Sequence, residues 1–530
     1  MSGTAHNAPS GNAADTQATA TLVASLMRPA AYPHAVERVE LLETHISWIF
    51  LAGPYAYKLK KPVDFGFLDF STPQRRELFC REELRLNRRL SDDLYLDVVP
   101  LHGPPEHAAF HGHGPVIDHA VRMRQFPQSA LLPAVLRRGA LGDGLIERFA
   151  DDLARFQAEA AVAPASGPHG CAEAVHEPVL ANFAALESSP LLAEQPGSPE
   201  RLERLLRWAE AEWERLRPRF AERLAAGRVR EGHGDLHLGN LLLHEGRIVA
   251  FDCLEFSDTL RWIDVISEMA FLVMDLQEHG QGRLGQRLLN RWLEQSGDWD
   301  GMDLWRWYTC YRALVRAKVA GLRGDAALHT YLELAEQLIT PPAPVLAITT
   351  GVSGLGKSRH ALAIAERLGW IRLRSDVVRK RLFGLWGIPA VAEHSGDPYR
   401  VDVSAELFTE RLPTLARRLI AAGFPVVVDA TFLRRLDRQR MAELARSLQV
   451  PFLILQPRAT VAEARERIRR RLGHGRDPSD ATEAVLEQQL AMAEPLDAAE
   501  LACCLAIEPD ADPDALAARV QAWCSSRCGS

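Results

Sequence analysis

Three polar residues near the middle of the chain have types and a spacing that suit phosphoryl transfer. Asp235 and Asn240 lie five positions apart in HGDLHLGN, and Asp252 follows a predicted hairpin turn at residues 245–247. Phosphoryl transfer requires a carboxylate that orients the attacking hydroxyl and accepts its proton, and oxygen ligands for the Mg²⁺ that bridges the nucleotide phosphates. The three residues supply both; the alternative interpretation is a polar turn between helices.

The segments around these residues, HGDLHLGN and FDCLEF, resemble the aminoglycoside phosphotransferase family over residues 26–335. The resemblance implies a two-lobed protein-kinase fold, with Asp235 as the catalytic carboxylate and Asn240 and Asp252 as Mg²⁺ ligands. The spacing from Asp to Asn also matches the protein-kinase pattern, although the Phe and Gly of its DFG turn are absent here.

A kinase-like fold also needs a strand lysine over the nucleotide phosphates and a helix glutamate that holds this lysine. The segment YAYKLKK supplies Lys58, and CREELRL supplies Glu82, and we predict both as ATP-binding residues. Lys60 and Glu83 stay open as alternatives, because Lys60 shares the strand face of Lys58 and Glu83 is the neighbour of Glu82. A lone lysine or glutamate in such elements is more often a solvated charge.

A second phosphate-binding pattern occurs in VLAITTGVSGLGKS, where an apolar strand leads into G-x-x-x-x-G-K-S. Glycines in such a loop allow backbone N–H groups to turn inward around a phosphate, and the following helix adds its positive end. Lys357 is predicted to reach the β and γ phosphates and Ser358 to bind Mg²⁺. The predicted ATP-binding residues are Gly351, Val352, Ser353, Gly354, Leu355, Gly356, Lys357 and Ser358.

Two carboxylates downstream complete this second constellation. The buried strand in GFPVVVDATFL ends in Asp429, a Walker-B-like Mg²⁺ ligand, and LRSDVVRKRL places Asp376 just after another strand. This half resembles small-molecule and polynucleotide P-loop kinases, including zeta-toxin-like kinases, over residues 343–510. The resemblance implies that Asp376 acts as a base or substrate anchor.

A basic helix near residue 470 resembles the lid of small P-loop kinases, whose arginines close over the transferring phosphate. Most of these arginines are expected to be solvated, since they cannot all face one site. The arginines are Arg465, Arg467, Arg469, Arg470, Arg471 and Arg476.

Several elements are expected to position these residues. Alternating apolar residues predict a β-hairpin within 45–63, and residues 73–90 predict a helix with Ser71 or Thr72 as its cap. A strand at 121–126 is expected to form the hinge that meets adenine through its backbone, and a strand at 451–457 is expected in the core of the second half.

The expected fold class is multidomain α/β, with an N-terminal two-lobed protein-kinase-like (α+β) domain followed by a parallel-sheet P-loop domain. Three prolines within residues 341–344 stop a helix and stiffen a spacer. The expected divisions are a disordered tail at 1–25, a kinase-like domain at 26–335 (small lobe 26–120, hinge about 121–128, helical lobe 129–335), a proline-rich linker at 336–344 and a P-loop domain at 345–530.

The composition excludes several classes of protein. A chain of 530 residues with 47% hydrophobic and 25% charged residues is neither a single small module nor a largely disordered protein. Its eight cysteines show no CxxC spacing, which argues against a zinc ribbon or a disulfide framework. The sequence contains neither an apolar run of membrane-spanning length nor the pattern of a secretory signal, so we expect a cytoplasmic protein.

Together the motifs predict an ATP-dependent phosphotransferase that uses ATP and Mg²⁺ at two sites and phosphorylates a hydroxyl of a small molecule. Two alternatives stay open for the second half: a regulatory ATP-binding module, and a zeta-toxin-like or polynucleotide-kinase-like phosphotransferase. No membrane partner is expected. Nucleic acid is disfavoured because no aromatic residues interleave with the arginines, but it stays an alternative for the P-loop half.

Overall fold

The computed structural model describes residues 13–66, 68–472 and 479–527, which form two compact units. Unit 1 contains the described residues up to Ala140 together with Gly232–Trp262, and unit 2 contains Leu141–Glu231 and the described residues from Ile263 onward. Each unit is described by itself.

Unit 1 is built around an antiparallel sheet with the strand order β1-β2-β3-β5-β4. The expected hairpin and helix are confirmed: β2 and β3 pair across a turn at Gly53, and Thr72 accepts a hydrogen bond at the start of α2. The hinge strand expected at 121–126 is the end of a longer strand, β5. The elements are β1 (Val39–Glu43), β2 (Ser47–Ala52), β3 (Tyr55–Lys60), α2 (Pro73–Ser91), β4 (Tyr95–His102), β5 (Val116–Arg124) and α3 (Leu132–Arg137).

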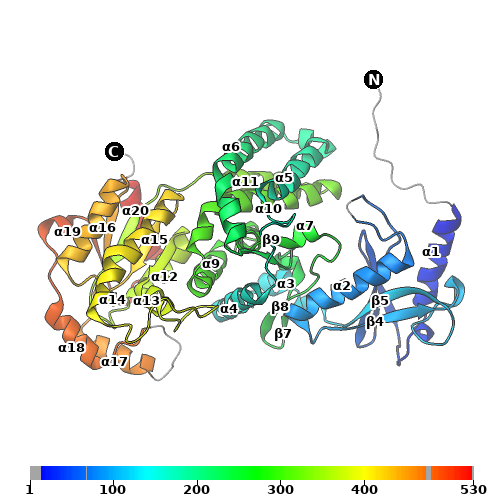
Figure 1. Ribbon diagram of the computed structural model, residues 1–530, viewed down its shortest axis with the longest axis horizontal. Helices are drawn as coiled ribbons and strands as arrows, with labels where there is room; N and C mark the ends of the chain where they lie inside the picture. The colour runs from blue at the N-terminus through cyan, green and yellow to red at the C-terminus, as the bar shows by residue number, and fades with distance from the viewer. Residues whose placement is uncertain (1–12, 67, 473–478, 528–530) are drawn as a thin grey trace. The chain divides into compact units, whose positions relative to one another are not determined.

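The two faces of this sheet are covered differently (Figure 1). The helix α1 (Ala13–Leu26) packs Leu22, Val23 and Leu26 against one face. The other face meets α2 and the hairpin of β7 (Leu241–His244) and β8 (Arg247–Ala250). Helix α1 begins at Ala13, within the stretch 1–25 that was expected as a disordered tail, and residues 1–12 lie outside the described residues.

Unit 2 begins with a helical part. Its helix α8 is buried over nearly its whole length, so apolar residues occur on every side of it rather than along one stripe. The helices are α4 (Asp143–Glu159), α5 (Ala172–Glu187), α6 (Ser198–Ala225), α8 (Val265–Glu278), α9 (Gly282–Ser296), α10 (Trp305–Leu322) and α11 (Ala327–Ile339).

Unit 2 continues into a parallel sheet with the order β11-β12-β10-β13-β14. Helices α12 and α20 pack on one face, while α15 and α16 lie against the strands from the other. The strands are β10 (Leu346–Thr349), β11 (Ile371–Arg374), β12 (Val426–Asp429), β13 (Phe452–Pro457) and β14 (Cys504–Ile507). The helices are α12 (Lys357–Leu368), α13 (Ser375–Leu382), α14 (Val401–Glu406), α15 (Leu412–Ala421), α16 (Arg435–Ser447), α17 (Val461–Leu472), α18 (Glu483–Met492), α19 (Ala498–Ala502) and α20 (Pro513–Ser525).

The compact units group the chain differently from the division expected at 336–344. Helix α9 packs on α4 and α8 and also on α12 and β11, so the helical part and the P-loop sheet fall into the same unit. The domain boundaries expected from the sequence stay a prediction.

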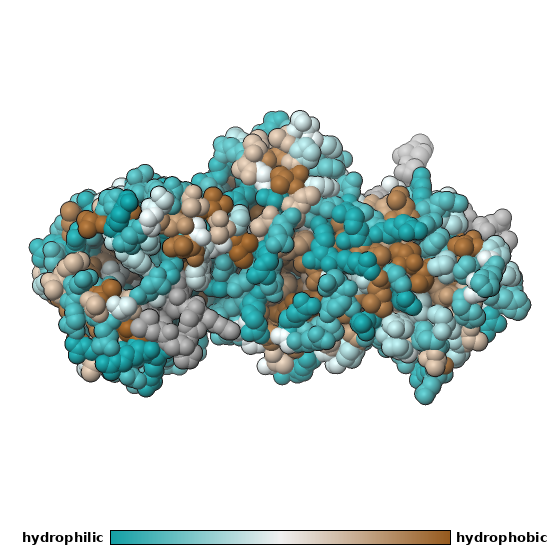
Figure 2. All heavy atoms as spheres, turned by 60° about the horizontal axis from the view of Figure 1, so that its bottom comes forward, coloured by the Kyte–Doolittle hydropathy of each residue, from teal (hydrophilic) through white to brown (hydrophobic). Residues whose placement is uncertain are grey.

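The described helices include none that is both long and apolar enough to cross a membrane. Hydrophilic residues are spread over the whole face shown in Figure 2.

Candidate functional site

The first constellation is centred on a carboxylate that bridges two lysines. Residues alternate between the two faces of β3, so that Lys58 and Lys60 both point towards α2. The Nζ atom of Lys58 lies 2.8 Å from Oε1 of Glu83, and that of Lys60 lies 2.7 Å from Oε2 of the same side chain. Both lysines and Glu83 are buried, which makes this an internal ion cluster and not a surface one.

Glu82, which the sequence analysis assigned as the partner of Lys58, is not its partner. Its side chain lies at the surface side of α2, where it accepts hydrogen bonds from Arg85 and lies 3.3 Å from Arg261. The buried face of α2 instead carries Arg76, Cys80, Glu83 and Asn87. These positions are three or four residues apart, which is the period of one helix face, but three of them are polar types that are usually exposed, so the sequence does not single out Glu83.

The loop that carries Asp235 and Asn240 is held by its own hydrogen bonds. The Asn240 amide donates to the Asp235 carboxylate over 3.0 Å and to its backbone carbonyl over 2.9 Å. Nε2 of His233 lies 2.8 Å from the carbonyl oxygen of Phe251, which ties this loop to the end of β8. The structure thus brings Asp235 and Asn240 together in one turn, with the Asp235 side chain one third exposed.

Asp252 is delivered by the β7–β8 hairpin, as expected. Its backbone lies in the left-handed region at φ 64°, and its N–H donates to the Tyr95 hydroxyl over 3.1 Å. Its carboxylate pairs with Lys58, and Glu255 pairs with Lys60 in the same way. Tyr95 and Glu255 were not identified from the sequence.

Electrostatics keep the first constellation charged. Burial alone would lower the pKa of Lys58. The carboxylates of Asp252 and Glu83 raise the pKa by more than burial lowers it, so the pKa of Lys58 lies well above that of a free lysine. Burial likewise raises the pKa of Glu83, and the two lysines more than reverse this effect. A fixed ammonium beside a carboxylate at the end of β8 can bind nucleotide phosphates and the metal ion that accompanies them.

The second constellation follows β10. Gly351, Gly354 and Gly356 have φ values of 117°, 85° and 91°, which L-residues with side chains rarely adopt. A Cβ atom on Gly354 would lie 2.5 Å from the backbone oxygen of Ala464, so the loop also needs glycine for space. Lys357 is buried at the start of α12, and its Nζ donates to the Val352 carbonyl over 2.7 Å. The loop is a concave set of backbone groups at a helix N-terminus, which suits a phosphate.

The side chains of Val352 and Leu355 belong to a hydrophobic cluster. Only their backbone groups are therefore available to a nucleotide. The Ser353 N–H donates to Oε1 of Gln489 over 2.7 Å, which links the loop to α18.

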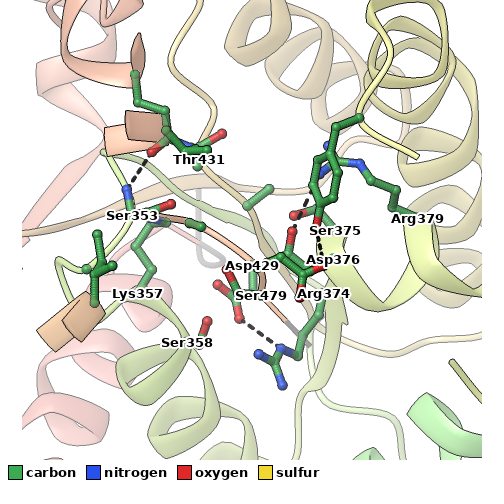
Figure 3. Close-up of a pocket in the computed structure, with 18 of the residues that line it drawn as sticks. Ser353, Lys357, Ser358, Arg374, Ser375, Asp376, Arg379, Asp429, Thr431 and Ser479 are labelled. Carbon is green, nitrogen blue, oxygen red and sulfur yellow. Dashed lines mark hydrogen bonds and ion pairs between the residues drawn. The ribbon is translucent and has the colours of Figure 1, made fainter. Parts of the chain in front are cut away.

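A pocket of about 630 Å³ opens over this loop (Figure 3). Lys357 and Ser358 line it from α12, Asp429 from the end of β12 and Asp376 from the first turn of α13. Of the predicted loop residues, Ser353, Gly354, Gly356, Lys357 and Ser358 therefore share one cavity with both carboxylates, whereas Gly351, Val352 and Leu355 do not line it. Arg374, which the sequence analysis did not select, also lines it.

Asp429 is suited to hold a cation. Its side chain is 3% exposed, and its Oδ2 atom accepts no hydrogen bond, while Nε of Arg374 lies 3.7 Å away. A buried carboxylate oxygen without a hydrogen bond is costly unless it finds a partner. The hydroxyl of Ser358 and the Asp429 carboxylate are oxygen ligands of the type that Mg²⁺ prefers, so the residues fit this ion.

One arginine of the basic helix α17 faces the pocket. Arg467 lines it and donates to the Gly354 carbonyl over 3.3 Å. Arg465, Arg469 and Arg470 instead pair with glutamates at the surface, as expected for most of the set. The side chains of Arg471 and Arg476 lie outside the described residues.

Comparison with known proteins agrees with these two constellations. A family model described as "Phosphotransferase enzyme family" matches residues 66–305, and one described as "AAA domain" matches residues 346–496. "Uncharacterized protein Rv2004c" from Mycobacterium tuberculosis (strain ATCC 25618 / H37Rv) is 32% identical over 460 residues, which cover 84% of this chain and 89% of that protein. "Uncharacterized protein Mb2027c" from Mycobacterium bovis shows the same identity and coverage.

Two solved structures match different shares of the chain. A choline/ethanolamine kinase family protein from Mesorhizobium loti is 13% identical, with a TM-score of 0.36 and coverage of 60% of this chain and 92% of that one. The APS kinase CysC from Mycobacterium tuberculosis is 20% identical, with a TM-score of 0.26 and coverage of 34% and 98%. From the family models and the mycobacterial relatives, the chain belongs to the phosphotransferase enzyme family, in a form fused to an AAA-type P-loop kinase domain.

Proposed function

We propose that this protein is an ATP-dependent kinase with two nucleotide sites, each of which phosphorylates a hydroxyl of a small molecule. The observation that carries the proposal is the pocket over the P-loop, because it holds groups for both substrates. Lys357 and Ser358 lie on the phosphate side, and Asp376 supplies a carboxylate for an acceptor in the same cavity. A module that only sensed ATP would not need that carboxylate.

In the P-loop site, the backbone N–H groups of residues 351–358 and the Lys357 ammonium bind the β and γ phosphates. Ser358 and Asp429 hold Mg²⁺, which neutralises charge on the phosphates when it is bound. Asp376 orients the acceptor hydroxyl and takes its proton as the phosphoryl group leaves the nucleotide. Its neighbour Arg379 has a nitrogen 3.6 Å from the Asp376 carboxylate and lines the same pocket.

In the kinase-like site, Lys58 binds the nucleotide phosphates and Glu83 fixes its position. Asp235 orients the acceptor hydroxyl, and Asn240 and Asp252 hold Mg²⁺. Support comes from the Lys58 ion pairs with Glu83 and Asp252 and from the hydrogen bond between Asn240 and Asp235. Lys58 and Asp252 form an ion pair with each other. This ion pair would have to weaken or break for Lys58 to bind the nucleotide phosphates and for Asp252 to bind Mg²⁺.

Two variants test the two sites separately in the full chain. ATP consumption is measured against a library of small-molecule alcohols, sugars and aminoglycosides. We expect Asp235→Asn and Asp376→Asn each to abolish phosphorylation of a different acceptor. Exposed aspartates that lie outside both sites provide the controls Asp258→Asn and Asp402→Asn, which should retain both activities.

The alternatives give different results. If Lys357→Ala removes nucleotide binding at the P-loop while all phosphoryl transfer is retained, the P-loop part is a regulatory module. If Asp376→Asn instead abolishes phosphorylation of a nucleic-acid end or a sugar nucleotide, this part is a polynucleotide-kinase-like or zeta-toxin-like enzyme. If Asp235→Asn changes no transfer reaction, the kinase assignment of the first site fails.

A further inference from the structure

Helix α9 presents one polar face to the P-loop sheet and to α12. Arg283, Arg287, Asn290 and Glu294 are spaced by three or four residues, so they lie along one side of the helix. Arg283 and Arg287 both pair with Glu366 on α12, at 3.4 and 2.8 Å. Figure 1 shows α9 between α4 and α12.

Asn290 pairs with the backbone of β11, the outermost strand of the parallel sheet. Its Nδ2 donates to the Trp370 carbonyl over 3.1 Å, and its Oδ1 accepts from the Arg372 N–H over 2.7 Å. These two hydrogen bonds from one amide side chain fix the position of α9 along the direction of β11. The next turn of α9 is consequently held level with the end of β11, where the P-loop pocket begins.

Glu294 occupies that next turn and is 1% exposed. Its Oε1 lies 2.6 Å from a guanidinium nitrogen of Arg372, and its Oε2 lies 3.9 Å from one of Arg374. Arg372 also donates to the Ser358 carbonyl over 3.1 Å. Arg372 and Arg374 therefore both reach the nucleotide site, one through the P-loop helix and one through the pocket wall. Arg291 of the same helix also lies 4.0 Å from Oε2 of Glu294.

Arg374 lies between two carboxylates. Nε is 3.7 Å from Oδ2 of Asp429, and the distance from Nη1 to Glu294 is similar. Neither contact is a close hydrogen-bonded pair, whereas the contact between Arg372 and Glu294 is. A guanidinium in this position is attracted by both carboxylates, and the charge of Glu294 opposes its full pairing with Asp429.

We infer that Glu294 is a positioning residue of the P-loop site, which draws the Arg374 guanidinium away from Asp429 and so leaves that carboxylate available to Mg²⁺. The inference rests on the proposed function, in which Asp429 holds Mg²⁺ beside the nucleotide. Without the Glu294 charge, Arg374 pairs fully with Asp429 and competes with the metal ion. The helical part of unit 2 thus sets the Mg²⁺ requirement of a site whose other residues all lie beyond residue 345.

Glu366 offers a matched control. Glu366 is also buried, and its ion pairs with Arg283 and Arg287 of α9 belong to the contact between α9 and α12. It is not among the residues that line the pocket. A purely structural effect of losing a buried carboxylate should appear in both Glu294→Gln and Glu366→Gln. An effect on Mg²⁺ should appear only in the first.

The test uses the full chain and the fluorescent nucleotide mant-ADP, titrated at a series of MgCl₂ concentrations. The P-loop signal is the part of the fluorescence change that Lys357→Ala removes. We expect Glu294→Gln to raise the Mg²⁺ concentration for half-maximal binding by about tenfold, the factor that 1.4 kcal/mol produces. Glu366→Gln should leave this midpoint within about twofold, since it changes no charge beside Arg374.

A second substitution separates positioning from folding. Arg374→Gln removes the competing cation, so it should lower the Mg²⁺ midpoint below that of the unmodified chain, and adding Glu294→Gln should then change nothing more. This variant also provides the test if Glu294→Gln does not fold. The inference about Glu294 is overturned, and the proposed function is not, if Glu294→Gln leaves the Mg²⁺ midpoint unshifted. The same holds if Glu294→Gln shifts the Mg²⁺ midpoint by an equal amount in the Arg374→Gln background. If Lys357→Ala removes no signal, the proposed nucleotide site fails, and the inference fails with it.

Discussion

The bridging carboxylate Glu83 allows a sharp test of how unit 1 is held together. In Glu83→Gln, the side chain keeps its size and loses its charge, which leaves two buried ammonium groups without their shared partner. With an effective dielectric constant of about 20, each contact of 2.7–2.8 Å represents a gross attraction of about 6 kcal/mol. Most of this attraction offsets the cost of burying the charges, and breaking such a cluster typically costs about 3–5 kcal/mol.

The adjacent residue supplies the control. Glu82→Gln removes the same charge from the same helix, but Glu82 is partly exposed. Its partner Arg85 is half exposed, and its other partner, the buried Arg261, keeps a second carboxylate in Asp258, so the change should cost about 1 kcal/mol or less. Hydrogen–deuterium exchange of peptides from β3 and α2 measures the stability of this region alone. Protection in these peptides should fall by about two to three and a half orders of magnitude in Glu83→Gln, since each 1.4 kcal/mol is a factor of ten, and by less than about tenfold in Glu82→Gln.

Two results of this exchange experiment would contradict the proposed ion cluster of Lys58, Lys60 and Glu83. Equal losses of protection in the two variants would refute the conclusion that Glu83, and not Glu82, is the partner of Lys58. A loss below about 1 kcal/mol in Glu83→Gln would show that water reaches the lysines and that the cluster is not desolvated. Either result would also remove the structural basis for fixing Lys58 over the phosphates.

Three further predictions concern other parts of the chain. Asp298→Asn should abolish an acid-sensitive part of the stability of unit 2. Burial raises the pKa of Asp298, but its buried partner Arg223 more than reverses this effect and lowers the pKa to about 2. The stabilisation by Asp298 is therefore present above the ordinary aspartate pKa of about 3.9 and is lost as the pH falls towards 2, which acid denaturation followed by circular dichroism measures. Leu26→Ala should destabilise unit 1 by about 2–5 kcal/mol in urea titrations, whereas Met27→Ala at its exposed neighbour should cost little, and equal costs would contradict the packing of α1. Gly354→Ala should weaken mant-ADP binding by more than about tenfold because a Cβ meets backbone there, while Gly282→Ala, which has open space around it, should bind normally.

The second site was the easier one to predict from sequence. Its loop residues, Gly351 to Ser358, are consecutive, so one local motif specifies both the backbone conformation and the ligand groups. Asp429 and Asp376 could be placed because carboxyl ends of parallel strands meet at one edge of a sheet. Ser353, Gly354, Gly356, Lys357, Ser358, Asp376 and Asp429 line one pocket, and their roles stay a prediction.

The first site could be predicted only in part. Asp235, Asn240 and Asp252 lie in two short segments with a recognisable order, whereas the glutamate partner comes from a helix whose buried face is polar. Hydrophobic periodicity cannot identify a face that carries Arg76, Glu83 and Asn87, because all three types are usually exposed. The choice between Lys58 and Lys60 was also undecidable, since both are buried on the same side of β3 and share Glu83.

Tertiary contacts decided the remaining differences. The α1 sequence is rich in Ala and Thr and carries only three anchoring side chains, so nothing local distinguishes it from a tail. The charges on α9 suggest a solvated helix in the sequence, but in the structure they form buried pairs with α12 and β11. Long-range pairing of charged residues leaves no periodic signal along the chain.

The pairing of Asn290 with β11 also bears on how the P-loop sheet could exist apart from the rest of the chain. An outer strand with unpaired N–H and C=O groups is a template for another strand, and proteins commonly cover such strands to prevent aggregation. Here the cover is a helix whose Asn290 lies 80 residues before Trp370 in the sequence, and Glu294 of the same helix neutralises the buried Arg372. Proteolytic separation near residue 340 that removed α9 would expose the outer edge of β11 and leave the buried Arg372 without Glu294, so the P-loop sheet depends on the helical part for a covered edge and a paired charge.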